Sequence, residues 1–253
     1  MLAERLARLL APVGAERRVL RGPVRGLRFV VEPGIGLSYA LGSPDAAPRH
    51  FAGRVRPGMT VFDVGANKGQ MTLLFASLVG PNGRVVAVEP APAEFASLTR
   101  NIQLNHLANV HAIQGAAAEA EGQLMFTYAA ARPTQGKLRD VERTYDNPGA
   151  DTFLVRALAL DSLVETHGPP DLIKIDVEGG AASALRGARG LIAAHSPTIY
   201  LELHGPEEQV GVRDELISRG YVGRTLDGRV VDDPTLGWHS PLWCERPATA
   251  GRT

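Results

Sequence analysis

The chain has 253 residues, of which 44% are hydrophobic and 21% are charged, a balance typical of a globular protein and not of a disordered one. Lys plus Arg and Asp plus Glu both number 27, so the formal net charge is zero, which argues against a general nucleic-acid binder. The single cysteine, Cys244, excludes an internal disulfide framework and a zinc site built on several cysteines. With no apolar run near the ~20 residues of a membrane span, we expect a cytoplasmic protein without a membrane or nucleic-acid partner.

Residues 1–56 predict an N-terminal extension made of a helix and a β-rich part. Residues 1–12 place charged side chains inside an apolar pattern, which is typical of an amphipathic helix and not of a signal peptide. Residues 17–40 read as short strands broken by Gly-Pro and Pro-Gly turns, which predicts a β-hairpin, and a helix is expected near 46–55. The hairpin is rich in arginine, and both a solvated face and a surface for an anionic ligand or partner fit that charge.

Residues 57–253 predict one α/β domain. Strands are expected at 60–64, 84–89, 110–114, 171–176 and 198–203, and helices at 70–79, 90–105, 181–194 and 207–219. This alternation indicates a mostly parallel sheet with helices on both faces. Strand-like pieces follow at 220–246. Between the halves, residues 122–159 break the alternation, and their middle, about 130–150, predicts a long insertion loop. Part of it, 132–147, is either a lid over bound substrate or an insertion without a role.

The strongest functional signal lies at the end of the first of these strands, because open parallel sheets bind ligands at the carboxyl ends of their strands. That end reads D-V-G-A-N-K-G at 63–69, a glycine loop that lets backbone approach a ligand closely. Asn67 replaces the middle glycine of a dinucleotide-binding loop. Asp63, expected at the pocket mouth, would repel a pyrophosphate and suits an ammonium group. Glu89 ends the next strand, where an acid accepts both ribose hydroxyls. An adenosine ribose that carries a cationic amino acid matches both acids, which predicts S-adenosylmethionine as cofactor.

The same motifs, taken in order, resemble those of FkbM-type methyltransferases. They are D-V-G-A-N-x-G at 63–69, V-E-P-x-P at 88–92, N-x-x-x-N at 101–105, L-D at 160–161 and K-I-D-V-E-G at 174–179. The resemblance covers about residues 58–202. It implies a Rossmann-like class I methyltransferase fold, with a seven-stranded, mostly parallel sheet whose last strand is antiparallel. It also implies methylation mostly at oxygen, on hydroxyls of sugars or secondary metabolites.

The chain also departs from that family. The family string usually continues E-G-A-E, whereas Gly180 and Ala181 follow Glu178-Gly179 here, so the second acid is absent. An N- or carboxyl-methyltransferase on a peptide or small acid, and a cofactor-binding domain without catalysis, therefore stay open, as does a homodimer. A nicotinamide-dependent oxidoreductase is disfavoured by the missing middle glycine. Residues 1–45 and 122–158 match no family motif and are expected to hold the small-molecule acceptor.

The cofactor candidates lie on the glycine loop or on the strand ends and turns beside it: Asp63, Gly65, Ala66, Asn67, Gly69, Glu89, Pro90, Ala116, Glu119 and Asp176. Methyl transfer needs an aligned nucleophile and, for a hydroxyl, removal of its proton. His204, which follows the strand at 198–203, is the first candidate base. A capping or surface role is the alternative for it, and Asp176 and Glu178 are further catalytic candidates. Lys174 is expected to be a buried ion-pair partner, and no metal site is predicted.

Overall fold

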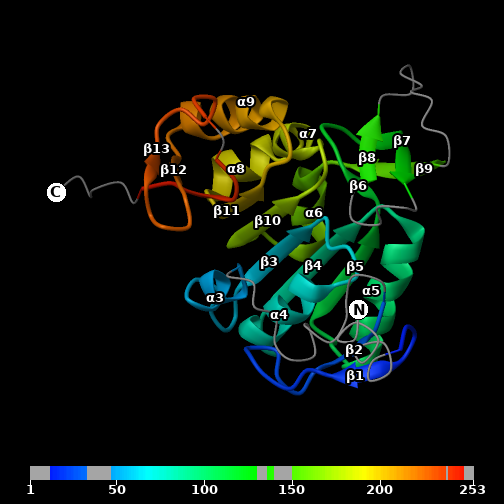
Figure 1. The fold of residues 1–253 in the computed structure, drawn as a ribbon. Helices are drawn as coiled ribbons and strands as arrows, with labels where there is room; N and C mark the ends of the chain where they lie inside the picture. Colours follow the sequence, from blue (N-terminus) through cyan, green and yellow to red (C-terminus); the bar gives the residue numbers. More distant parts are fainter. Residues whose placement is uncertain (1–11, 33–46, 130–135, 140–149, 238, 248–253) are drawn as a thin grey trace, which may run out of the picture.

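The structure is a computed structural model that describes residues 12–32, 47–129, 136–139, 150–237 and 239–247. The helix expected at 1–12 lies almost wholly outside these residues, as does most of the segment 132–147. The described chain forms a large twisted sheet between two groups of helices, with a small hairpin below it and a second sheet beside it (Figure 1). None of the described helices is long and apolar enough to cross a membrane.

The central sheet has the order β13-β12-β14-β11-β10-β3-β4-β5. Its strands are β3 (Thr60–Val64), β4 (Arg84–Glu89), β5 (Val110–Gln114), β10 (Leu172–Asp176), β11 (Thr198–Glu202), β12 (Val222–Arg224), β13 (Val230–Val231) and β14 (Leu242–Glu245). The five strands from β11 to β5 are parallel, and β14 runs antiparallel between β11 and β12. The predicted seven-stranded sheet with an antiparallel last strand is therefore confirmed, and the two-residue β13 extends its edge.

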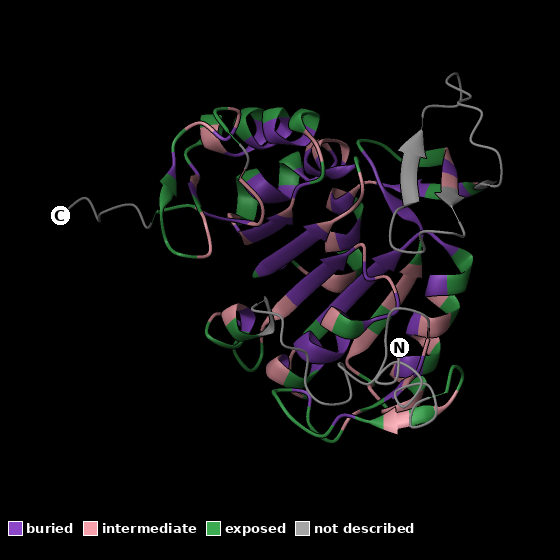
Figure 2. Cartoon of the chain, viewed as in Figure 1, coloured by how far each residue is buried: buried purple, intermediate pink, exposed green. Residues whose placement is uncertain are grey.

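Helices cover both faces of this sheet because its central strands are apolar on both sides, as expected for parallel strands. Phe62 and Val64 of β3 pack in one core cluster with side chains of α6 (Leu160–His167), α7 (Ala181–Arg186), α8 (Arg189–His195) and α9 (Pro206–Glu215). Val61 packs in the opposite cluster with α3 (Ala47–Ala52) and α4 (Gln70–Val79). Beside them, α5 (Pro92–Leu104) packs Leu98 on β4 and β5. The central strands are accordingly buried throughout most of their length (Figure 2).

The helix predicted over 181–194 is two helices, α7 and α8, separated at Gly187. A Cβ atom at Gly187 would collide with the carbonyl oxygen of Ala118, so the segment after β5 passes directly against this break. A short 3-10 helix, Ile217–Arg219, ends the stretch predicted as a single helix over 207–219. The helix α6 was not predicted, because its eight residues follow the irregular insertion without a turn signal.

The insertion between β5 and α6 forms a second sheet of order β6-β9-β7-β8. Its strands are β6 (Ala116–Ala117), β7 (Gly122–Ala129), β8 (Gly136–Arg139) and β9 (Ala150–Leu158). The prediction of a continuous loop over about 130–150 is therefore wrong for the four residues of β8. These four residues pair with β7, and the sequence does not display that pairing. The remaining loop residues, 130–135 and 140–149, lie outside the described ones.

The predicted N-terminal hairpin is confirmed as β1 (Glu16–Arg18) and β2 (Arg28–Val30), paired antiparallel. Asn101 of α5 and Asn105, which follows the helix, bind its second strand: Asn101 Oδ1 accepts from Val30 N at 2.8 Å, and Asn105 Nδ2 donates to Arg28 O at 2.7 Å. Phe29 and other side chains of the extension belong to the same core cluster as α4 and β3. The boundary predicted at residue 56 thus does not separate two hydrophobic cores.

Candidate active site

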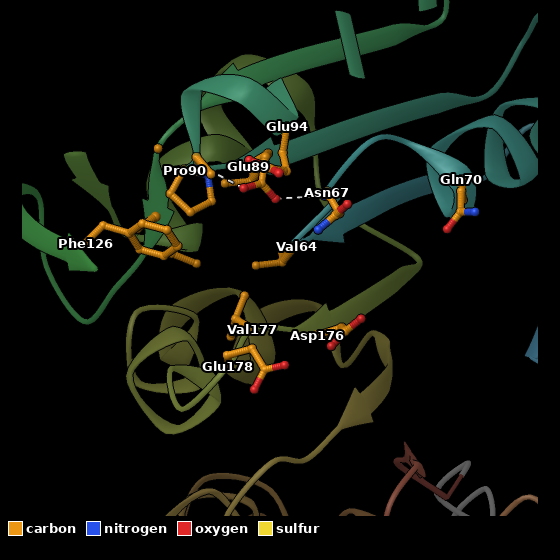
Figure 3. A pocket seen from close by; sticks show the side chains of 16 residues that line it. Val64, Asn67, Gln70, Glu89, Pro90, Glu94, Phe126, Asp176, Val177 and Glu178 are labelled. Carbon is orange, nitrogen blue, oxygen red and sulfur yellow. Dashed lines mark hydrogen bonds between the residues drawn. The ribbon is translucent and has the colours of Figure 1, made fainter. Parts of the chain in front are cut away.

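A pocket opens at the carboxyl edge of the central sheet, where β3, β4 and β10 end (Figure 3). The glycine loop after β3 forms one wall, and Asp176 to Glu178 after β10 form the wall facing it. Glu89, Pro90 and the turn into α5 follow β4 and form a third side. The location agrees with the rule that ligands of open α/β sheets bind outside the carboxyl ends of the strands.

The backbone of the glycine loop is left-handed at three positions, with φ of 76° at Gly65, 50° at Asn67 and 89° at Gly69. Asn tolerates this conformation better than most residues, and the Asn67 side chain accepts a hydrogen bond from Lys68 N at 2.9 Å. A Cβ at Gly65 would collide with the carbonyl oxygen of Asp176, and one at Gly69 would lie 2.7 Å from Leu98 Cδ1. Gly65 is therefore required by the protein's own packing, and the left-handed backbone disfavours a side chain at both glycines, in addition to any room that they leave for a ligand.

Asp63 lies below this loop and not at the pocket mouth, which corrects the position expected from the sequence. Its side chain is 0% exposed and does not line the pocket. Its Oδ2 accepts from Thr72 Oγ1 at 2.6 Å, and Lys174 Nζ lies 3.4 Å from its Oδ1. The physical reason is the register of the sheet, which pairs Asp63 with Lys174 on the neighbouring strand. Asp63 is thus the buried ion-pair partner of Lys174, and it does not reach the ammonium group of a ligand in the pocket.

Lys174 lies between Asp63, which is buried, and Asp176, which lines the pocket. Its predicted role as an ion-pair partner is confirmed. Its Nζ donates to Gly65 O at 2.9 Å and lies 3.4 Å from Asp176 Oδ2. Burial alone would lower the pKa of Lys174, but the charges of Asp176 and Asp63 raise it above its usual value. A charged Lys174 therefore holds the glycine loop against β10.

Glu89 lines the pocket from the end of β4. Its side chain is 5% exposed, and its carboxylate accepts two backbone hydrogen bonds, from Asn67 N at 2.8 Å and from Ala91 N at 2.9 Å. Burial raises the pKa of Glu89 to about 7, although these two N–H groups lower it. Glu94, on the first turn of α5, also lines the pocket, and its charge raises the pKa of Glu89 further.

The three predicted catalytic residues lie together at the opposite wall. His204 Nε2 is 2.9 Å from Asp176 Oδ1, and His204 Nδ1 is 3.6 Å from Glu178 Oε2. The hydrogen bond to Asp176 raises the pKa of His204, with a further contribution from the charge of Glu178. Burial would raise the pKa of Asp176, but Lys174 and His204 lower it to about 2, so Asp176 is ionised at neutral pH. Asp176 and Glu178 line the pocket, whereas His204 contacts both of them without lining the pocket itself.

Glu208 of α9 holds the loop that carries His204. Glu208 is buried, and its carboxylate accepts hydrogen bonds from His204 N and, at 3.0 Å, from Ala181 N at the start of α7. The backbone of His204 is therefore held by the neighbouring helices, while its ring remains 28% exposed.

The remaining predicted cofactor residues divide into two groups. Pro90 and Ala116 line the pocket. Ala66 and Gly69 do not, because Ala66 packs inward against Leu98 and Gly69 lies at the start of α4. Glu119 is also outside it and forms an ion pair with Arg186.

Several residues that line the pocket are not among those predicted from the sequence: Val64, Gln70, Glu94, Gly115, Phe126 and Val177. Gln70 could have been found as the first helical residue after the glycine loop. Phe126 carries no such signal, because it reaches the pocket from the inserted sheet.

A second cavity, of about 700 Å³, adjoins the first along the chain. It is lined by the turn from Ala118 to Leu124, by the start of α7 and by Glu207 of α9. Gly179 also lines it, and this residue directly follows Glu178 of the first pocket. Its volume lies in the range of small-molecule sites. Within the described residues, no group of three His, Cys, Asp or Glu side chains is arranged to hold a metal ion.

Two features define a Rossmann-like class I methyltransferase fold. The first is the strand order, with the antiparallel β14 inserted near one end of a parallel sheet. The second is a pocket between a glycine loop and an acid at the end of the next strand. The chain belongs to the FkbM methyltransferase family: the family profile described as "Methyltransferase FkbM domain" matches residues 63–222.

Curated relatives match shorter stretches. "Methyltransferase 1" of Beauveria bassiana is 27% identical over 146 residues, which are 50% of this chain and 57% of that protein. "31-O-demethyl-FK506 methyltransferase FkbM" of Streptomyces tacrolimicus is 57% identical over 47 residues, 19% of this chain and 18% of that protein. These matches cover less than two thirds of either relative. A crystal structure of a methyltransferase FkbM from Methylobacillus flagellatus KT is similar with a TM-score of 0.50 and 18% identity, over 74% of this chain and 43% of that chain, and supports the fold.

Proposed function

We propose that the chain is an S-adenosylmethionine-dependent methyltransferase that methylates a hydroxyl oxygen of a sugar or a secondary metabolite. The observation that carries the proposal is the pocket itself, where buried Glu89 and the ionised carboxylate of Asp176 line two different sides. A ribose diol and a cationic amino acid need these two acceptors, one at each end. The Streptomyces tacrolimicus relative is named for an O-methylation, which agrees with an oxygen acceptor.

The residues that the structure describes fit this cofactor, but Asp176 takes the role that the sequence predicted for Asp63. Glu89 would accept the ribose hydroxyls, since each carboxylate oxygen retains a lone pair beside its backbone hydrogen bond. Asp176, and not Asp63, would face the cationic end, because Asp176 lines the pocket and stays ionised. When bound, the cofactor supplies a methyl group already activated on a sulfonium.

The protein's own contribution to the transfer is then alignment and proton removal. A hydroxyl must lose its proton as the methyl group moves, and a neutral imidazole can accept it. Asp176 binds His204 Nε2 and orients the ring, while Nδ1 faces Glu178 at a distance too long for a hydrogen bond. The acceptor would therefore approach on the Nδ1 side, with Glu178 beside it. This Asp176–His204 pair favours a catalytic protein over a domain that only binds the cofactor.

The second cavity is the proposed acceptor site. It continues from Glu178 to Gly179 along one wall, so an acceptor held there would lie next to the proposed base. Its lining combines carboxylates, amides and hydroxyls with the Arg186 guanidinium, which suits a ligand rich in hydroxyl groups.

Two measurements test the proposal. Calorimetry is expected to show binding of S-adenosylhomocysteine and none of NAD, since the loop lacks the G-x-G sequence that binds a pyrophosphate. Incubation with methyl-labelled S-adenosylmethionine and a panel of sugars and hydroxylated metabolites is then expected to give a product that gains one methyl group, placed on oxygen by NMR. Binding of NAD alone would contradict the cofactor assignment, and a methyl group on nitrogen would contradict the acceptor assignment.

A further inference from the structure

The cofactor pocket changes in character from one side of Glu89 to the other. Towards the glycine loop its lining is polar, with Asn67, Gln70 and Asp176. On the other side, beyond Pro90, it is apolar, with Ala116 and Phe126 (Figure 3). A ligand with a charged end and a flat aromatic end would place its aromatic end against this apolar side.

Phe126 reaches the pocket from the inserted sheet and not from the central one. It lies on β7, directly opposite Phe153 of β9, and the two rings are 5.6 Å apart between centroids. Its side chain is 6% exposed and packs in a cluster with Ala91, Ala116 and Val155. The ring is therefore held in place by its protein neighbours before any ligand arrives.

We propose that Phe126 forms the adenine-binding wall of the cofactor pocket and contacts the base with its ring. The inference rests on the proposed function, since it needs an adenosine cofactor. Aromatic rings bind bases through their π-faces and also exclude water from them. The inserted sheet then supplies part of the cofactor site in addition to the acceptor site expected of it. Phe126 thereby sets affinity for the base, while Glu89 binds the sugar.

The contacts also define a matched control. Phe153 belongs to the same apolar cluster and touches Phe126, but it does not line the pocket. Phe153→Leu therefore disturbs the packing of the inserted sheet without removing a ligand contact. Phe126→Trp keeps an aromatic face at the pocket, and Phe126→Leu keeps an apolar side chain without one.

The test uses calorimetry of the full chain with S-adenosylhomocysteine and with 5′-methylthioadenosine, which keeps the base and sugar but lacks the amino acid. Phe126→Leu and Phe126→Ala are expected to weaken both ligands at least about tenfold, the effect of losing one base–aromatic contact. Phe126→Trp and Phe153→Leu are expected to bind within about twofold of wild type. In turnover assays, Phe126→Leu is expected to raise the KM for the cofactor with kcat unchanged at saturation.

Each of the following outcomes would contradict either this inference or the proposed function on which it rests. If wild type binds neither ligand, the proposed function fails. If wild type binds both and Phe126→Leu binds them equally well, Phe126 does not contact the base. If Phe153→Leu weakens binding as much as Phe126→Leu, the ring acts only through packing of the sheet. Should Phe126→Ala lose its cooperative thermal transition, the comparison of the Leu and Trp variants decides.

Discussion

We expect Glu89 to make the proposed cofactor binding depend on pH. Because burial raises its pKa to about 7, the side chain changes from mostly protonated at pH 6 to mostly ionised at pH 8. The ionised form is the stronger acceptor for ribose hydroxyls. We therefore expect affinity for S-adenosylhomocysteine to rise by up to about tenfold over this interval, following the ionised fraction. Calorimetry at several pH values measures it.

The raised pKa of Glu89 has the opposite effect on the stability of the unliganded protein, which falls as pH rises. A raised pKa in the folded state means that stability is lost as pH rises from the model-compound value of 4.5 towards about 7. The variant Glu89→Gln is expected to lose both pH dependences and to bind at least about tenfold more weakly at pH 8, since a bond to a charged group contributes ~1.5–3 kcal/mol. Equal pH slopes in this variant and in wild type would show that another group titrates.

His204 is expected to limit the rate through its own protonation state. Since Asp176 raises the pKa of His204, the neutral imidazole forms at a higher pH than for an isolated histidine. The turnover number should rise with pH through that pKa, and Asp176→Asn should move the rise to lower pH. His204→Ala should lower the turnover number at least about a hundredfold with little change in cofactor affinity.

His204→Gln is the informative control, because glutamine forms hydrogen bonds but is no base near neutral pH. It is expected to be almost as slow as His204→Ala. Recovery of most of the rate would mean that His204 only positions the acceptor, and Asp176 or Glu178 would then be the preferred base. An affinity loss as large as the rate loss would indicate a pocket-lining role.

Among the elements, the N-terminal hairpin is linked to the glycine loop through Asn101. Asn101 accepts from Val30 N and donates to Lys68 O at 2.8 Å, so it joins β2 to the glycine loop. Asn101→Ala leaves these backbone groups without their partner, which costs about 1–3 kcal/mol of unfolding free energy. Chemical denaturation should show this loss, and hydrogen exchange should be faster at residues 28–30.

A matched variant distinguishes this effect from a general loss of stability. Asn109 donates to Gly80 O at 2.9 Å, away from the hairpin. Asn109→Ala should also destabilise the protein but leave exchange at residues 28–30 unchanged. Equally fast exchange there in both variants would contradict the role given to Asn101.

How far the sequence predicts the elements depends on how local their signals are. The bounds of β3, α4, β4 and β5 agree with the predicted ranges, because each is an unbroken pattern ended by a turn. The pairing of β7 with β8 and β9 joins residues distant in the chain, and no periodicity reveals it. The residues of the candidate site likewise divide into those with a local signal and those placed by distant pairing. Glu89 and Asp176 follow from their positions at strand ends, whereas burial of Asp63 against Lys174 follows only from strand register.

At the scale of the whole molecule, residues 1–56 and the rest are expected to fold as one unit. Phe51 of α3 packs edge-on against Phe75, Tyr200 and Trp243, with ring centroids 4.7 to 5.1 Å apart. Removing one such buried ring costs about 3–5 kcal/mol, a large part of the 5–15 kcal/mol that stabilises a typical domain. A chain that starts at residue 57 should therefore lose near-ultraviolet circular dichroism and bind hydrophobic dyes.

The single variant Phe51→Ala in the full chain provides the comparison. It should retain the fold with reduced stability, because the remaining contacts of the extension persist. A cooperative transition of wild-type stability in the chain starting at residue 57 would show instead that residue 56 is a true domain boundary.

The position of β14 has a consequence for synthesis on the ribosome. It lies between β11 and β12, both of which are made before it. Translation at ~5–20 residues per second leaves an interval of roughly 1 to 4 s between the completion of β12 and that of β14. During that interval β11 has an open edge, which is the part of a nascent sheet that pairs with other chains. Chaperone capture and aggregation of the growing polypeptide should therefore concentrate in those seconds.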